Sequence, residues 1–221
     1  MVPERTERRL AAILAADVAG YSRLMGSDEE RTLARLKAHR REQIDPTVAA
    51  HRASLAKSTG DGILVKFPSV VDAVRCAIEV RRAMADRNAS KQEETRIRFR
   101  IGINLGDIII ESDDIYGDGV NVAARPERFA DPVGICISDA SYQQVRDKIE
   151  SGFEDISEQR LKNISRPVRV YRVRSDAGSG PVRTVLDLPD FNDEGRNHGI
   201  LLAAKRWTPQ GAHIGGSHVG L

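Results

Sequence analysis

The clearest periodicity in the chain runs from residue 96 to residue 112. Apolar side chains alternate there with polar or small ones, at Ile97, Phe99, Ile101, Ile103 and Leu105. This alternation predicts a strand with one buried face, and we expect it to turn back at Gly106-Asp107 into a second strand. Residues 10–18 are apolar without strict alternation, which predicts another buried strand.

Caps, turns and residue spacing predict the remaining elements. Ser27 and Glu30 form a capping box that opens a helix to about Ile44, and Ser69 caps a second predicted helix. Residues 54–67 predict a hairpin around a Gly-Asp-Gly turn. The other predicted elements are a helix after residues 117–119, a strand at 134–138, a short helix from residue 139 and a strand at 166–173.

The order of these elements indicates the fold class. Helices cross between some of the strands, and hairpins connect other strands of the same sheet. This combination indicates an α/β (α+β) fold, a ferredoxin-like split βαβ sandwich with a mostly antiparallel sheet and flanking helices.

The composition changes near residue 174. Residues 175–221 hold 8 of the 18 glycines and show no long periodic pattern. We therefore expect one domain over residues 1–174, followed by a flexible, glycine-rich C-terminal tail over residues 175–221.

Charge and apolar content exclude several classes of partner. A net charge of +2 over 221 residues gives no case for nucleic-acid binding. No apolar run approaches the ~20 residues of a membrane span, and the charged N-terminus lacks the apolar core of a signal peptide. Cys76 and Cys136 both lie in apolar stretches, which suits reduced core residues. We therefore expect a soluble cytoplasmic protein, or a soluble piece of a larger system, that binds neither nucleic acid nor a membrane.

Two acidic residues stand out against this background. Asp17 interrupts the apolar strand 10–18 near its end, and Asp61 lies between two glycines at the predicted hairpin turn. If the strand lies beside the hairpin, the two carboxylates meet at one end of the sheet, where they suit Mg²⁺ or Mn²⁺. The alternative is that Asp17 merely ends a strand and that Asp61 is an ordinary turn residue.

A second polar pair follows in the segment "DDIYGDGVNVAAR". Asn121 and Arg125 are four residues apart, on one face of the predicted helix. An amide and a guanidinium near the start of a helix suit an anion with an attached sugar. The alternative is a solvated polar face.

Together, four separated blocks of the chain resemble the catalytic domain of the class III nucleotidyl cyclases, especially the bacterial adenylate cyclases. The blocks occur in the family's order and cover roughly residues 8–174. They are "ILAADVAGYSRLM", "KSTGDGILVKF", "IGINLGDIII…DDIYGDGVNVAAR" and "GICIS…LKNISRPVRVYRV".

The resemblance implies a cofactor set. Asp17 and Asp61 match the family's metal-binding aspartates, aided by the backbone carbonyl of Val18. Two Mg²⁺ or Mn²⁺ ions per active site would then bridge the triphosphate of ATP and activate the ribose 3′-hydroxyl.

The resemblance also implies substrate contacts. Lys57 and Asp114 match the pair that reads adenine, since a Lys donor suits adenine N1 and a carboxylate suits the 6-amino group. Asn121 matches the residue that orients the ribose, and Arg125 the one that stabilises charge on the α-phosphate. Lys162 matches the lysine that holds the terminal phosphates.

In the family each site lies between two subunits. One chain that carries both the metal-binding residues and the substrate-contacting residues therefore indicates a homodimer.

The sequence departs from the family at Pro126, which stands where the family continues with Leu-Glu. A proline inside the helix would disturb the backbone at Arg125, unless the helix already ends there. The implied function is an adenylate cyclase; the alternative is a weak or inactive cyclase-like module that binds nucleotide or dimerises as a regulator. A diguanylate cyclase or polymerase palm lacks its sequence signature here.

Overall fold

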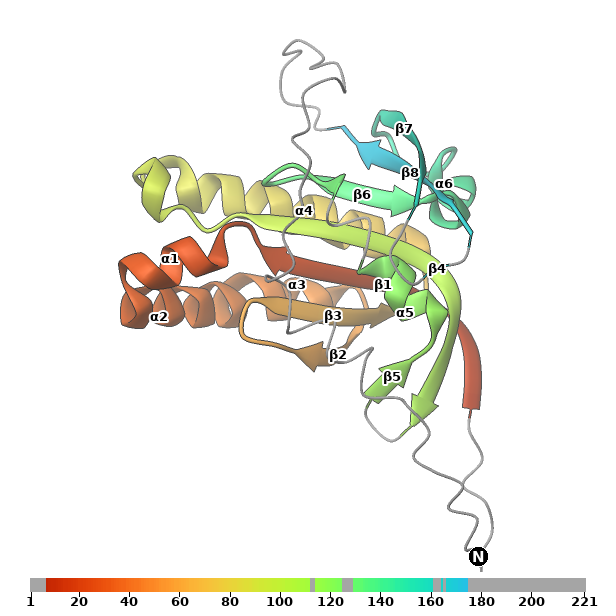
Figure 1. The fold of residues 1–221 in the computed structure, drawn as a ribbon, viewed down its shortest axis with the longest axis horizontal. Helices are drawn as coiled ribbons and strands as arrows, with labels where there is room; N and C mark the ends of the chain where they lie inside the picture. The colour runs from red at the N-terminus through yellow and green to blue at the C-terminus, as the bar shows by residue number, and fades with distance from the viewer. Residues whose placement is uncertain (1–6, 112–113, 125–128, 161–163, 165, 175–221) are drawn as a thin grey trace, which may run out of the picture.

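The computed structural model describes most of the region that the motifs cover. The described residues are 7–111, 114–124, 129–160, 164 and 166–174. Their strands form one sheet in the order β2-β3-β1-β4-β6-β8-β7, with β5 paired to β4 (Figure 1). The strands are β1 (Glu7–Val18), β2 (Ser54–Ser58), β3 (Gly62–Phe67), β4 (Phe99–Glu111), β5 (Asp114–Tyr116), β6 (Ile135–Ser138), β7 (Phe153–Gln159) and β8 (Val168–Val173).

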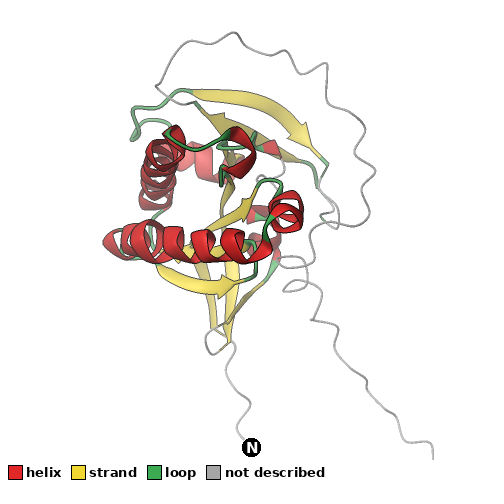
Figure 2. Cartoon of the chain, turned by 90° about the vertical axis from the view of Figure 1, so that its left-hand side faces the viewer, coloured by secondary structure: helices red, strands yellow, loops and turns green. Residues whose placement is uncertain are grey.

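The pairing between strands is antiparallel except between β4 and β6. Figure 2 shows from the side how the long helices pack along the strands. The α-helices are α1 (Tyr21–Ser27), α2 (Glu29–His39), α3 (Asp45–Ala50), α4 (Val70–Ala89), α5 (Asp118–Ala123) and α6 (Asp139–Val145). A π-helical turn, Arg40–Ile44, joins α2 to α3, and a short 3₁₀ turn, Glu93–Thr95, precedes β4. The predicted mixed α+β class with a mostly antiparallel sheet is confirmed.

Strand β1 runs through the centre of the sheet, and its residues 11–18 are buried on both faces. Four of its side chains join the larger core with α4: Ala12, Leu14, Ala16 and Val18. Three join a smaller core with α5: Ala11, Ile13 and Ala15. We call these sides of the sheet the α4 face and the α5 face. Burial on both faces explains why residues 10–18 lack strict alternation.

The expected turn at Gly106-Asp107 is wrong. Strand β4 continues without interruption to Glu111, and β1 pairs with it along its length, including Leu10 with Asp107. The chain reverses only beyond Glu111, since β5 starts at Asp114 and pairs back onto β4. The long pairing with β1 stabilises the extended backbone and overrides the turn preference of the Gly-Asp dipeptide.

The expected start of the first long helix is also wrong. Ser27 is the last residue of α1, and the cap of α2 is Asp28, whose carboxylate accepts from the Arg31 backbone N–H at 3.0 Å. The helical path continues past Ile44 into α3 through the π-helical turn. The second helix begins as predicted, with Ser69 accepting from Asp72 N–H.

Both cysteines are buried and free, as expected for reduced core residues. Burial raises the pKa of the Cys76 thiol, and of the Cys136 thiol, to about 12. Within the described ranges, no helix is long and apolar enough to cross a membrane.

His39, in the last turn of α2, is half-buried beside several charged side chains. The Arg87 guanidinium donates to its Nδ1 atom at 3.4 Å. Its Nε2 atom has no hydrogen-bond partner in the part of the chain that the structure describes. Burial lowers the pKa of His39, and the positive charges of Arg87 and Arg35 lower it further. The folded protein therefore favours the neutral imidazole.

We expect His39 to make the fold less stable in mild acid. Its pKa is lower in the folded state than the value of about 6.5 in an unfolded chain, so the unfolded state binds the proton more readily. The free energy of unfolding should therefore fall as the pH drops below about 6.5. Urea unfolding at several pH values measures this loss, and His39→Gln should lose less stability than wild type over the same range. Equal losses in the two proteins would exclude His39 as the cause.

Candidate functional site

Asp17 is a buried acid at the end of β1. Only 1% of its surface is exposed. It follows Ile13 and Ala15 in the alternation of β1, so its side chain lies on the α5 face. Its cross-strand partners are Gly62 of β3 and Arg100 of β4. A buried carboxylate needs a partner, and Arg100 supplies a bidentate one. Its Nε and Nη2 atoms donate to the two carboxylate oxygens at 2.9 and 2.5 Å.

Asp61 lies at the turn between β2 and β3, beside the end of β1. The Val18 N–H donates to the Asp61 carbonyl oxygen at 3.0 Å. Thr59 closes the turn: its N–H donates to the Gly62 carbonyl at 2.8 Å, and its hydroxyl accepts from Gly62 N–H at 3.1 Å. The structure therefore brings Asp17 and Asp61 to the same end of the sheet, in the arrangement that the sequence analysis expected.

Tyr21 borders the same turn and was not foreseen. Gly20, with φ at 70°, turns the chain from β1 into α1. This turn places the Tyr21 hydroxyl against Gly60, at 3.5 Å from the position that a Cβ would take. Burial raises the pKa of Tyr21, and the negative charges of Asp61 and Glu29 raise it further. The phenol therefore stays protonated at neutral pH and adds no charge to this end of the sheet.

Arg100 is a second residue that the sequence analysis missed. The alternation of residues 96–105 places it among the polar positions of the strand, together with Arg96 and Arg98. Those two neighbours bind the exposed Glu93 instead. The difference lies in the register, because only Arg100 is paired directly with Asp17. The sequence signal that could have identified it is the presence of one acid in an otherwise apolar neighbouring strand.

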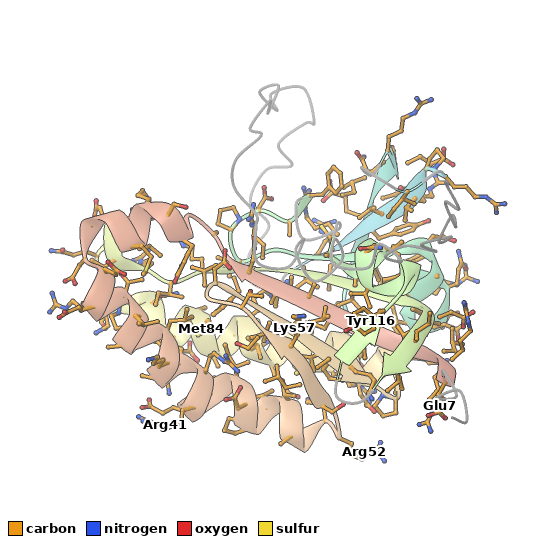
Figure 3. All side chains as sticks on the ribbon, turned by 60° about the horizontal axis from the view of Figure 1, so that its bottom comes forward. Glu7, Arg41, Arg52, Lys57, Met84 and Tyr116 are labelled. Atoms are coloured by element: carbon orange, nitrogen blue, oxygen red, sulfur yellow. The ribbon has the colours of Figure 1, made fainter. Side chains whose placement is uncertain are left out.

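Asp17 and Lys57 lie on the α5 face of the sheet. Lys57 of β2 pairs with Leu64 of β3, whose side chain belongs to the α5-face core. Strand β2 also lies against β5, the strand that begins at Asp114. Figure 3 labels Lys57 on β2 and Tyr116 on β5. The backbone thus brings the two strands of the expected adenine pair together, although the Asp114 side chain lies outside the described part of the structure.

The structure describes only some of the other predicted site residues. Asn121 is half-buried on α5, a helix that ends at Ala123 with Ala124 as its C-cap. Arg125, Pro126 and Lys162 lie outside the described residues. The position of the helix end agrees with the alternative in which the helix stops before the proline.

The donor atoms at the end of β1 suit a hard cation. Carboxylate oxygens of Asp17 and Asp61, with a backbone carbonyl, are ligands that Mg²⁺ takes together with substrate phosphates. No group of three or more His, Cys, Asp or Glu side chains forms a metal site among the residues described. The donor types of Asp17 and Asp61 fit Mg²⁺ or Mn²⁺, and metal binding by these residues stays a prediction.

The described part of the site is thus one end of a mostly antiparallel sheet, where two acids and a guanidinium lie. A family model described as the adenylate and guanylate cyclase catalytic domain matches residues 4–174. The chain belongs to this family of nucleotidyl cyclase domains, and the resemblance inferred from the motifs is confirmed.

Relatives of the chain agree with this assignment. A putative adenylate cyclase 3 of Rhizobium meliloti is 48% identical over 171 residues, which are 77% of this chain and 29% of that protein. The chain thus spans less than a third of that relative. Among solved structures, an adenylate/guanylate cyclase/hydrolase from Silicibacter pomeroyi is 48% identical with a TM-score of 0.74, over 78% of this chain and 100% of that one. The adenylyl cyclase CyaB from P. aeruginosa is 25% identical with a TM-score of 0.68, over 78% and 97% of the two chains.

Proposed function

We propose that this domain is an adenylate cyclase, which converts ATP to 3′,5′-cyclic AMP and pyrophosphate. The observation that carries the proposal is the placement of Asp17 and Asp61 at one end of the sheet, in a domain of the cyclase family. In the reaction, the ribose 3′-oxygen forms a bond to the α-phosphorus and loses its proton. The bond from that phosphorus to the β-phosphate oxygen breaks, and pyrophosphate leaves.

Asp17, Asp61 and the Val18 carbonyl are the proposed ligands of two Mg²⁺ or Mn²⁺ ions. When bound, such ions would neutralise the triphosphate and make the 3′-hydroxyl more acidic. The buried position of Asp17 suits this role, because a carboxylate held at a fixed place binds a ligand without losing further conformational freedom. Arg100 then has a second role, since its planar guanidinium can donate to a phosphate in place of the carboxylate.

Lys57 and Asp114 are the proposed base-reading pair. The ammonium of Lys57 would donate to adenine N1, and the Asp114 carboxylate would accept from the 6-amino group. Guanine offers the opposite pattern, with a donor at N1 and an acceptor at position 6. The contact between β2 and β5 supports the pair, because it brings the backbones of the two residues onto neighbouring strands.

Asn121, Arg125 and Lys162 complete the proposed site. Asn121 would orient the ribose, Arg125 would stabilise the charge that develops on the α-phosphate, and Lys162 would bind the terminal phosphates. In the proposed homodimer, Asp17 and Asp61 of one protomer act with the other five residues of its partner. Two-fold symmetry then gives two equivalent sites.

The second candidate function is a weak or inactive cyclase-like module that binds nucleotide or dimerises. Pro126, next to the proposed Arg125, is the sequence feature that favours it. Incubation of the purified protein with Mn²⁺ and ATP, followed by measurement of cyclic AMP, separates the two candidates. Product formation supports the enzyme, and saturable nucleotide binding without product supports the module.

ATP should be used at least about tenfold more efficiently than GTP, because each mismatched polar group in a closed site costs roughly 1–3 kcal/mol. The measurement is kcat/KM for each nucleotide with the same metal. Lys57→Ala should lower kcat/KM for ATP and reduce the ratio of kcat/KM for ATP to kcat/KM for GTP. Lys37→Ala, at an exposed position on α2, should change neither kcat/KM for ATP nor this ratio. Comparable efficiencies with the two nucleotides in wild type would contradict the assignment of the pair.

A further inference from the structure

A buried amide connects the centre of the sheet to the start of α5. Asn104 lies on β4, where it is only 5% exposed, and it pairs with Ile13 on the α5 face. Its Nδ2 atom donates to the Gly119 carbonyl at 3.0 Å, and its Oδ1 atom accepts from the Ser138 hydroxyl at 2.7 Å. A carbonyl can only accept, so the nitrogen of the amide must face Gly119. Both ends of this buried side chain are thus satisfied.

The Asn104 side chain is also supported from the opposite side. Ser138 ends β6 and caps α6, where its hydroxyl accepts from the Ser141 N–H at 3.4 Å. The Ser141 hydroxyl donates to the Ile103 carbonyl at 3.4 Å, next to Asn104 in β4. Ser138 and Ser141 are both buried. A closed network of this kind restricts the amide to one orientation, because any rotation would leave a buried polar group unpaired.

The first turn of α5 lies in direct contact with the β4 backbone. A Cβ added at Gly119 would lie 2.7 Å from the Asp107 carbonyl oxygen, which leaves no room for any side chain. A Cβ added at Gly106 would lie 3.1 Å from the Gly119 Cα and 3.0 Å from Asn104 Nδ2. Steric contact therefore sets the shortest possible distance between α5 and the β4 backbone. The hydrogen bond from Asn104 to the Gly119 carbonyl keeps α5 at that distance.

We infer that Asn104, supported by Ser138, is a positioning residue that fixes the first turn of α5 and thereby the placement of Asn121. Asn121 follows Gly119 by two residues in this short helix, so a shift of the first turn moves it directly. The kinetic part of the inference rests on the proposed function, in which Asn121 orients the ribose. The structural part, a fixed α5, does not depend on it.

Asn104→Ala should lower kcat about 10–100-fold, because small misplacements of reacting groups are costly. The KM for ATP should change less than about threefold, since binding through the triphosphate and the base is retained. Backbone amides of residues 120–124 should exchange hydrogen at least about tenfold faster than in wild type, because α5 opens more often. Ser138→Ala removes the hydrogen bond to the Asn104 amide and also the cap of α6. It should lower kcat and accelerate exchange in residues 120–124 by less than Asn104→Ala.

Asn88→Ala is the matched control. Asn88 is likewise a buried asparagine, 8% exposed, and its Nδ2 atom donates to the Ile97 carbonyl at 2.8 Å, at the far end of α4. Both variants lose a buried bond from an amide to a carbonyl, and Asn104→Ala also loses the bond from the Ser138 hydroxyl. Both should therefore melt at a lower temperature than wild type. Only Asn104→Ala should lower kcat and accelerate exchange in α5.

Two results would overturn the inference. One is Asn104→Ala with wild-type exchange in residues 120–124. The other is Asn88→Ala with an equal loss of kcat, which would reduce the effect to general destabilisation. If wild type forms no cyclic nucleotide, the proposed function fails, and the exchange measurement still decides whether Asn104 holds α5.

Discussion

Asp61→Asn should reduce cyclic AMP formation at least about a hundredfold while the protein stays folded, because metal-assisted charge stabilisation is worth several kcal/mol. The substitution keeps the size of the side chain. The bond that ties this turn to β1 is made by the backbone carbonyl of Asp61 and not by its carboxylate. The measurements are initial rates with Mn²⁺ and ATP, together with the melting temperature.

Asp86→Asn, at an exposed carboxylate on α4, is the matched control and should keep the wild-type rate. Asp17→Asn should also be inactive, but its loss of activity has two possible causes. Its carboxylate is buried under Arg100, so the substitution breaks an ion pair as well as a proposed metal site. A folded Asp61→Asn protein with a rate near that of wild type would remove the metal assignment.

Activity should rise when two impaired proteins are mixed, Asp61→Asn and Lys57→Ala. In a mixed dimer, one site receives the intact acid half and the intact base-reading half, and the other site receives both defects. Equal mixing makes half of the dimers mixed, each with one good site of two, so we expect roughly a quarter of the wild-type rate. The measurement is cyclic AMP formation after the chains have been mixed and allowed to exchange.

The control is each variant mixed with itself, which should keep the low rate of that variant alone. Differently tagged chains show whether mixed dimers form. If they form without activity, the site is built within one chain, and the proposed sharing between protomers is incorrect.

The placement of Asp17 and Asp61 at one end of the sheet could be expected from the sequence only on the condition that the strand lies beside the hairpin, which the structure shows. An apolar strand, an acid at its end and a Gly-Asp-Gly turn each have a clear signature, and adjacency of the strand and the hairpin is enough to join them. The α+β class follows from the same signals. The roles of these acids stay predictions, as do those of Arg125 and Lys162 outside the described residues.

Arg100 and the length of β4 could not be predicted in the same way, because both depend on register. Alternation shows that Arg100 lies on the opposite side from Ile101 and Ile103. It does not show that this side is covered, nor that Asp17 lies directly across. Gly106-Asp107 likewise has the composition of a turn, and only the partner strand keeps it extended. Asn104 and Ser138 were missed because the bond between them joins strands 34 residues apart.

Under the proposed function, the ion pair between Arg100 and Asp17 couples the binding of two ligands. The Arg100 guanidinium satisfies the buried Asp17 carboxylate at 2.5 and 2.9 Å. A cation that approaches Asp17 must compete with this internal positive charge, whereas a nucleotide phosphate offers Arg100 another partner. Each ligand therefore makes the other bind more tightly, and by thermodynamic reciprocity the gain is equal in both directions. The domain then binds metal and nucleotide as one complex instead of holding the metal in advance.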